Sequence, residues 1–303
     1  MVDSSNYYDF YYDEPPEELG KQEPYIQQAE SAIEEFFRRR KTPFHFRQLQ
    51  VLFETQFFHI TTAQAIYRLI NRGFLRTKRY EAGANAVTFV FPSHLLTSLK
   101  TEKILNIHMK SKATTIALYD SPIISKDLAD HFEGLVKYEL RANNLSIVSI
   151  HTNEYKKRKW TKTKANLDFI AEHENGRAFG VQAKNELKPI EKNELEEQIK
   201  ICSYLHIKPV FIVRYMPFSF VPLVKQNEGF LLVIGNQLWP LGYRQLHSKI
   251  VSKLSISTKQ ISKELKELAP KLRSQWPIEI RTDIPVDASK RLNYWITTGK
   301  YPN

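Results

Sequence analysis

Cysteine occurs only once in this 303-residue chain, as Cys202, which excludes an internal disulfide and a cysteine-rich zinc site. The nine histidines show neither the His-x-x-x-His nor the His-Glu-x-x-His spacing, so zinc-hydrolase chemistry is not expected. The chain also lacks a Gly-x(4)-Gly-Lys phosphate loop and a Gly-x-Ser-x-Gly elbow. ATP-driven translocation and serine-hydrolase chemistry are therefore not expected of it either.

Long apolar runs are missing too. No stretch approaches the length of a membrane span, and the acidic N-terminus has no apolar core of a signal peptide. We therefore expect a cytoplasmic protein with no membrane partner. Hydrophobic residues at 42% and aromatic residues at 12% are enough to build a core, so a folded chain is expected rather than a disordered one.

Positive charge is present in excess and is unevenly distributed. Lysine and arginine number 44 against 33 acids, a net charge of +11, which favours a polyanionic partner and DNA first. Residues 38–112 hold fourteen bases and three acids, and a second basic run spans residues 156–164. Residues 1–20 carry six acids and no base, and we interpret residues 1–22 as a flexible acidic arm. The alternative for both basic stretches is the solvated surface of an ordinary basic protein.

Residues 23–92 predict a small helical domain that ends in a hairpin. Apolar residues recur at helical spacing from Glu23, and Pro43 breaks that helix. A very short strand and a second helix follow, and a third helix is expected to begin at Thr61 or Thr62 as N-cap and to stop at Gly73. Helix, short strand, helix, helix and hairpin is the order that resembles a winged-helix DNA-binding domain.

The outward side chains of this domain are the types that read DNA. Glutamine and arginine pair with base edges, and cations on a wing suit phosphates. The expected DNA-binding residues are Gln64, Arg68 and Arg72 on the third helix and Arg76, Lys78 and Arg79 on the wing. Winged helices also serve as protein-interaction modules, and that alternative stays open.

Residues 93–125 are interpreted as a connector with a helix at about 95–109, and residues 126–243 as an α/β domain. Within it we expect a helix at 126–143, strands at 145–151, 167–172, 178–184, 210–215 and 229–234, and a helix at 191–205. A C-terminal extension covers residues 244–303. It begins with a long amphipathic helix or helix pair at about 244–275, and the tail after Pro277 is not placed.

Three residues in this domain have the chemistry for phosphodiester hydrolysis, which needs a divalent cation held by oxygen ligands and a further positive group. Asp168 stands at the start of an apolar strand, and Gln182 and Lys184 end the strand after the Asn175-Gly176 turn. Residues two apart on a strand share a face, so Gln182 and Lys184 should point to the same place.

The segment from about 126 to 215 resembles the PD-(D/E)xK nuclease superfamily, and Gly-Val-Gln-Ala-Lys-Asn is most similar to the Mrr-type restriction endonucleases. The resemblance implies a restriction-endonuclease-like mixed sheet flanked by helices. It also implies a metal site of Asp168, Gln182 and Glu133, with Glu139 as the fallback for Glu133. Gln198 matches a residue that supports the site in relatives, although the tyrosine that some subfamilies place four positions later is Cys202 here.

The chain departs from the family pattern at two places. Leu167 replaces the proline of the family name, and a neutral amide at Gln182 replaces the usual carboxylate. The amide leaves the site one negative charge short and should weaken Mg²⁺ binding. The expected activity is that of a Mg²⁺- or Mn²⁺-dependent DNA endonuclease of restriction or defence type, acting as a homodimer on both strands. The alternatives are an inactive DNA-binding protein on a nuclease scaffold and a structure-selective repair or junction nuclease.

The second basic run adds a candidate DNA-binding surface. It lies directly before the strand of Asp168, so we expect it to line the same cleft. Trp160 would be available there to stack on a base or sugar. The residues assigned to this surface are Lys156, Lys157, Arg158, Lys159 and Trp160.

Overall fold

The computed structural model describes residues 23–82, 85–96, 98–254, 258–260 and 288–298, and it divides the chain into two compact units. The first unit comprises residues 1–121 and 248–256, and the second comprises residues 122–247 and 257–303. The acidic arm predicted at 1–22 lies outside the described residues.

The first unit contains three helices packed on a small antiparallel sheet, in the order expected from the sequence. Its first elements are α2 (Glu23–Arg38), β1 (Phe44–His45), α3 (Phe46–Phe53), α4 (His59–Asn71), β2 (Leu75–Ala82) and β3 (Asn85–Pro92). The strands are ordered β1-β3-β2. Apolar faces of the three helices enclose one core, which explains the three- and four-residue spacing of their apolar residues.

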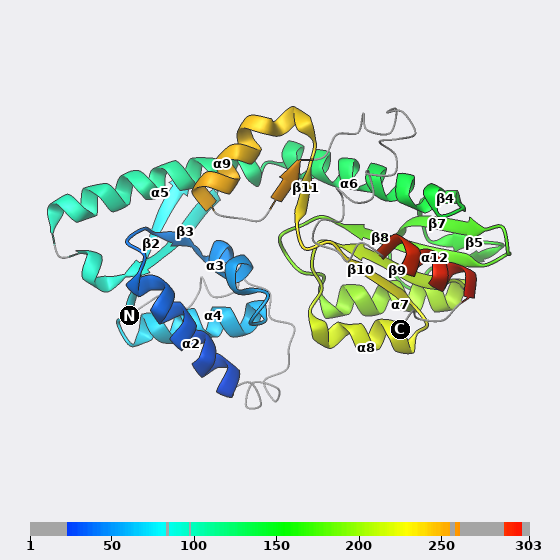
Figure 1. The fold of residues 1–303 in the computed structure, drawn as a ribbon, viewed down its shortest axis with the longest axis horizontal. Helices are drawn as coiled ribbons and strands as arrows, with labels where there is room; N and C mark the ends of the chain where they lie inside the picture. The colour runs from blue at the N-terminus through cyan, green and yellow to red at the C-terminus, as the bar shows by residue number, and fades with distance from the viewer. Residues whose placement is uncertain (1–22, 83–84, 97, 255–257, 261–287, 299–303) are drawn as a thin grey trace. The chain divides into compact units, whose positions relative to one another are not determined.

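Two further segments belong to this unit. A short 3₁₀ turn, η3 (Ser93–Leu96), leads into α5 (Leu99–Tyr119), which packs on β2 and β3 (Figure 1). The region predicted as a connector is therefore mostly one helix, ten residues longer at its C-terminal end than expected. The end of α9 (Arg244–Leu254) is also tied to this unit, because Lys253 Nζ donates a hydrogen bond to Ser111 Oγ at 2.7 Å.

The second unit is a mixed sheet between helices. Its elements up to the third sheet strand are α6 (Pro122–Ala142), β4 (Leu145–Thr152), β5 (Glu154–Tyr155), β6 (Arg158–Lys159), β7 (Leu167–His173) and β8 (Ala178–Lys184). The remaining ones are α7 (Lys192–Leu205), β9 (Lys208–Val213), η4 (Phe218–Phe220), α8 (Val221–Gln226), β10 (Phe230–Val233), β11 (Gln237–Trp239), η5 (Leu241–Tyr243), β12 (Thr258–Gln260) and α12 (Ala288–Thr298). The large sheet has the order β10-β9-β8-β7-β4. The β4–β7 and β7–β8 pairs are antiparallel, and the β8–β9 and β9–β10 pairs are parallel.

Each face of this sheet buries its own core. On one face α6 and α12 cover the central strands, with Phe132, Phe179 and Trp295 among the buried residues (Figure 1). On the other face α7 and α8 cover the strands through two smaller clusters. A strand that is buried on both faces is nearly continuously apolar, which is the pattern that β9 shows after Lys208.

Three sequence predictions need correction. The helix expected to begin at Thr61 or Thr62 starts one turn earlier, since the Thr62 N–H already donates to the Phe58 carbonyl inside α4. A single helix over 244–275 is wrong, because α9 ends at Leu254 and residues 258–260 pair in parallel with β11. The alternative of a helix pair falls largely on residues 261–275, which lie outside the described residues. The unplaced tail contains α12, whose apolar residues complete the core of the large sheet.

Among the described residues, no helix combines the length and the apolar character needed to cross a lipid bilayer.

The docking of α12 can be tested with two neighbouring aromatic residues. Trp295 is buried against Phe179 and Phe230, whereas Tyr294 is 44% exposed. We expect Trp295→Ala to reduce the free energy of unfolding by about 3–5 kcal/mol, since it opens a cavity in the core. Tyr294→Ala should change it by less than about 0.5 kcal/mol. Thermal unfolding followed by circular dichroism measures both, and equal shifts would show that α12 does not pack as described.

Candidate functional site

The strands that carry Asp168, Gln182 and Lys184 are antiparallel neighbours. The register pairs Ile170 with Gly180 and Phe169 with Val181, so Asp168 and Gln182 are the next pair along. The Asp168 Oδ2 atom accepts a hydrogen bond of 2.7 Å from the Ala183 N–H. The carboxylate of β7 therefore reaches across to β8 between the two predicted site residues of that strand.

A fourth residue, His151, enters the same site from β4. The β4–β7 register pairs Ile150 with Phe169 and Thr152 with Leu167, which places His151 beside Asp168. A β-bulge between Ile147 and Ser149 shifts this register by one residue. Without the bulge the neighbour of Asp168 would be Ile150, so the bulge decides that an imidazole stands there.

The helix before the sheet supplies Glu133, as the family resemblance predicts. Ligand atoms of Glu133, His151 and Asp168 all lie within 4.8 Å of one another. The His151 Nε2 atom is 3.6 Å from Glu133 Oε2. The fallback residue, Glu139, is buried further along α6 and accepts a hydrogen bond from the Asn143 side chain, so Glu133 is the carboxylate that faces Asp168.

Gln182 carries a side-chain oxygen that lacks a partner. Its Oε1 atom is fully buried and accepts no hydrogen bond from any described residue. A buried acceptor left without a donor costs about 1–3 kcal/mol. Gln182 stands opposite Asp168, and directly opposite residues share a face of the sheet. An amide oxygen with the Asp168 and Glu133 carboxylates is a donor set of the kind that a divalent metal ion takes.

Lys184 is held in place by an acid that the sequence did not single out. Its Nζ atom forms an ion pair of 2.6 Å with Glu194 Oε2 on α7, and its side chain is only 15% exposed. On the same helix, Gln198 donates a hydrogen bond of 3.3 Å to the Asn166 carbonyl, two residues before Asp168. Helix α7 thus fixes both the lysine and the approach to β7.

The electrostatics of the site favour a bound cation. Burial raises the pKa of Asp168 to about 6, the Ala183 N–H opposes this, and the nearby Glu133 carboxylate adds to the rise. The charge of His151 lowers the pKa of Asp168 only in part, and Lys137 lies beside Glu133, at 3.7 Å. Ionisation of Asp168 near neutral pH therefore becomes easier when a cation lies beside it.

The second basic run forms a hairpin, β5–β6. Lys156 and Lys157 occupy its two-residue turn with φ values of 43° and 67°, the conformation of a tight hairpin turn. Lys156 pairs with Glu172 at 3.2 Å. Glu172 is four residues from Asp168 on β7, or roughly 13 Å at the rise of a strand. The turn of the hairpin therefore lies beside Glu172, and the expectation that the basic run lines the same cleft as Asp168 stays a prediction.

Trp160 is not available for stacking on DNA, contrary to the prediction. Its ring is buried against Tyr204 on α7, with 5.7 Å between ring centroids. Its Nε1–H donates a hydrogen bond of 2.9 Å to Thr163 Oγ1. The ring anchors the hairpin to the core of the second unit because its large apolar surface is more stable away from water.

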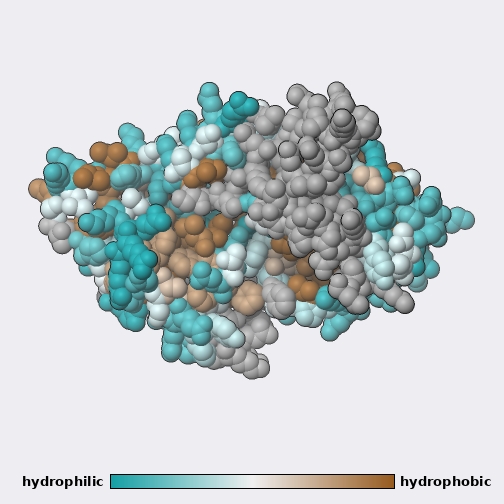
Figure 2. Space-filling model, in the orientation of Figure 1, coloured by the Kyte–Doolittle hydropathy of each residue, from teal (hydrophilic) through white to brown (hydrophobic). Residues whose placement is uncertain are grey.

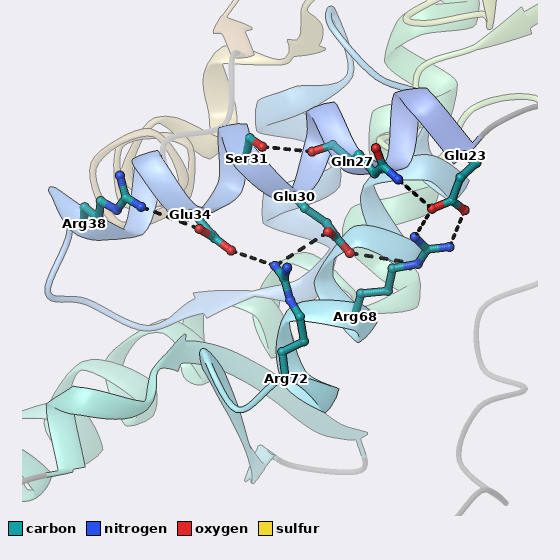
Figure 3. A network of polar contacts seen from close by, with 8 residues as sticks. All are labelled: Glu23, Gln27, Glu30, Ser31, Glu34, Arg38, Arg68 and Arg72. Carbon is teal, nitrogen blue, oxygen red and sulfur yellow. Dashed lines mark hydrogen bonds and ion pairs between the residues drawn. The ribbon is translucent and has the colours of Figure 1, made fainter.

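In the first unit, Arg68 and Arg72 do not project freely from α4. Both turn toward α2, where Figure 3 shows them in a network of acids. Arg68 donates two hydrogen bonds of 2.6 Å to Glu23 and lowers the pKa of that carboxyl to about 2, and Arg72 pairs with Glu34 at 2.7 Å. The two arginine side chains are nonetheless 41% and 54% exposed, so the assignment of Arg68 and Arg72 to DNA binding stays a prediction.

The other predicted DNA-binding residues of this unit are less engaged. Arg76 and Arg79 are exposed on β2, and Gln64 is half-buried on α4. Lys78 donates a hydrogen bond of 3.0 Å to Asn106 and lies 3.5 Å from Glu102, both on α5. Arg76 and Arg79 therefore remain the strongest candidates for binding phosphates.

Comparison of the chain with models of protein families, with curated proteins and with solved structures found no match. The family named from the sequence motif therefore stays a prediction.

The burial of Asp168 predicts a pH-dependent gain in stability when its charge is removed. A carboxyl whose folded pKa is raised costs stability once it ionises, so the cost develops between about pH 4 and pH 6 and is complete above that. We expect Asp168→Asn to raise the thermal unfolding midpoint at pH 7.5 in metal-free buffer. The corresponding gain in the free energy of unfolding is up to about 3 kcal/mol. The gain should vanish near pH 4.

Asp130→Asn is the matched control, because Asp130 is an exposed acid on α6. It should leave the midpoint nearly unchanged at both pH values. A midpoint for Asp168→Asn that is the same as wild type at pH 7.5 would contradict the cost assigned to this buried carboxylate.

Proposed function

We propose that this chain is a divalent-metal-dependent DNA endonuclease whose second unit hydrolyses phosphodiester bonds. The observation that carries the proposal is that ligand atoms of Asp168 and Glu133 lie within 4.8 Å of one another, with Gln182 opposite Asp168 on the neighbouring strand and a positioned lysine two residues further along it. Oxygen donors of this kind hold Mg²⁺ or Mn²⁺, and a neighbouring cationic side chain suits a reaction that develops negative charge. The mixed sheet flanked by helices supports a restriction-endonuclease-like fold for this unit.

Each residue has a definite part in the proposed reaction. Asp168, Glu133 and Gln182 would hold the metal ion, which supplies Lewis-acid polarisation of the phosphate and a lower pKa for a bound water. Lys184 donates a hydrogen bond to the attacking water or to a phosphate oxygen and offsets the charge that develops in the transition state. Glu194 positions Lys184, because its carboxylate holds Nζ at 2.6 Å.

DNA as the substrate is supported by charge and surface. The chain has a net charge of +11, and the hairpin β5–β6 presents exposed cations, one of which pairs with Glu172 on the strand that carries Asp168. Figure 2 shows mostly hydrophilic residues over the end of the second unit where β4, β5 and β7 are labelled in Figure 1. We propose that the first unit is a winged-helix domain that holds DNA through its wing, and that two copies act together on the two strands.

The neutral amide at Gln182 favours one second candidate, a DNA-binding protein that retains the fold without the activity. The missing negative charge weakens a metal site, whatever its geometry. In that case binding to DNA would persist while hydrolysis is absent.

Catalysis is tested by plasmid cleavage with Mg²⁺ or Mn²⁺. We expect Asp168→Ala and Lys184→Ala to reduce cleavage at least about 100-fold, since each removes a group that stabilises the transition state. DNA binding should be nearly unchanged, because the cations that bind phosphates are spread over other residues. Lys188→Ala is the control, since Lys188 is an exposed lysine four residues after Lys184.

Gln182→Glu separates the two candidate functions. It restores the usual carboxylate and should lower the Mg²⁺ concentration needed for cleavage. If the wild-type chain fails to cut DNA with every divalent ion tried and Gln182→Glu creates cleavage, the inactive DNA-binding protein is the correct assignment.

The role of the hairpin β5–β6 in DNA binding is tested by the dependence of DNA affinity on salt concentration. Log affinity for DNA falls linearly with log salt concentration. Replacing Lys156, Lys157, Arg158 and Lys159 by glutamine should reduce the magnitude of this slope by about 0.9 for each phosphate that the variant no longer neutralises. The single-turnover cleavage rate at saturating protein should change little, because none of these four residues is assigned to the metal ion or to the attacking water. A control variant that replaces Lys192, Lys200 and Lys225, on α7 and α8, should keep the wild-type slope. Equal slopes for both variants would move the DNA-binding surface elsewhere.

A further inference from the structure

The imidazole of His151 is a group that the proposed nuclease chemistry does not use. We propose that His151 is a direct metal ligand, and that its nitrogen makes the centre bind Mn²⁺ in preference to Mg²⁺. The inference deepens the proposed function and rests on it for the place of the metal. It depends on the position of His151 between Glu133 and Asp168.

The distances suit a shared ion. Two donors that each lie about 2.1 Å from one metal ion can be at most about 4.2 Å apart. The 3.6 Å between His151 Nε2 and Glu133 Oε2 is already inside that limit, and the whole cluster spans no more than 4.8 Å. Small side-chain rotations therefore complete the coordination, and the His151 side chain, 61% exposed, has room to make them.

An independent observation points to a ligand at the same place. The buried Gln182 Oε1 has no partner among the described residues, and Gln182 follows His151 and Asp168 in one row across β4, β7 and β8. An ion pair between His151 and Glu133 alone leaves this oxygen unsatisfied. Such an exposed pair is also worth only about 0–1 kcal/mol. A metal ion ligated by the row accounts for both features.

The donor set decides which cation is preferred. Mg²⁺ takes oxygen ligands in near-ideal octahedral geometry and gains little from an imidazole. Mn²⁺ also takes carboxylate and amide oxygens, and although it is the weakest binder of the first-row series it is softer than Mg²⁺ and accepts an imidazole nitrogen beside them. With only two carboxylates in the set, the neutral imidazole adds a donor bond that strengthens Mn²⁺ binding and contributes little to Mg²⁺ binding.

The test is Mn²⁺ binding by the full chain without DNA. Titration followed by the electron paramagnetic resonance of free Mn²⁺ gives the affinity, and competition with Mg²⁺ gives the second affinity. We expect His151→Asn to weaken Mn²⁺ binding at least about tenfold and to leave Mg²⁺ binding nearly unchanged. Asparagine is chosen because residue 151 has a φ of 48°, a region that asparagine tolerates.

Nitrogen ligation is read directly from the bound ion. Electron spin echo modulation of the wild-type Mn²⁺ complex should show coupling to an imidazole nitrogen, and His151→Asn should lose it. His108→Asn, at an exposed histidine on α5 of the first unit, should retain both the coupling and the affinity. Absence of nitrogen coupling in wild type, or equal Mn²⁺ affinity for wild type and His151→Asn, overturns the inference.

These outcomes are distinct from failure of the proposed function. Nitrogen-coupled Mn²⁺ without any DNA cleavage upholds the ligand and rejects the nuclease. Cleavage that depends on Asp168 but proceeds equally with Mg²⁺ and Mn²⁺, in wild type and in His151→Asn, upholds the nuclease and rejects the ligand.

Discussion

The hydrogen bond from the Ala183 N–H to the Asp168 carboxylate joins the ends of β7 and β8, and the candidate site is built around it. It holds an acid where burial has raised its pKa to about 6, beside a second carboxylate from α6. Such an arrangement costs stability in the absence of a cation. The core on both faces of the sheet offsets that cost, because apolar residues on β7 and β8 remain buried up to the residues that carry the chemistry.

The close approach of α7 to the sheet depends on a missing side chain. A β-carbon on Gly180 would lie 2.5 Å from Cys202 Sγ and 2.8 Å from Leu167 Cδ1, so only glycine permits this packing. Because α7 lies so near, Glu194 reaches Lys184 and Gln198 reaches the chain before β7. The lone cysteine is therefore a packing residue, and it stands where some relatives of the proposed family place a tyrosine.

Electrostatic pairing also shapes the first unit. The acids of α2 form ion pairs with Arg68 and Arg72 (Figure 3), whereas Arg76 and Arg79 on β2 are exposed. A DNA phosphate competing for these arginines would have to displace carboxylates at 2.6–2.7 Å. Binding of phosphates by Arg76 and Arg79 requires no such exchange, and it would hold DNA without reading its sequence.

Local pattern was sufficient to predict most elements of the described structure. Period-two and continuous apolar runs predicted β7, β8, β9 and β10, and helical spacing predicted α2, α6 and α7. Asp168, Gln182 and Lys184 were identified in the same way, since a strand position and an i, i+2 relation are local properties. The element α12 was missed, because its isolated apolar residues have meaning only against the sheet that they cover.

Only the tertiary structure decided which distant segments of the chain lie next to each other. A one-residue bulge in β4 places His151 beside Asp168, and α7 brings Glu194 to Lys184. Ion pairs with α2 set the orientation of Arg68 and Arg72, and burial makes Trp160 a core residue. Sequence spacing reports which face of its own helix or strand a side chain occupies. It does not report which residue of another element lies opposite, because strand register and helix packing are set by the whole core.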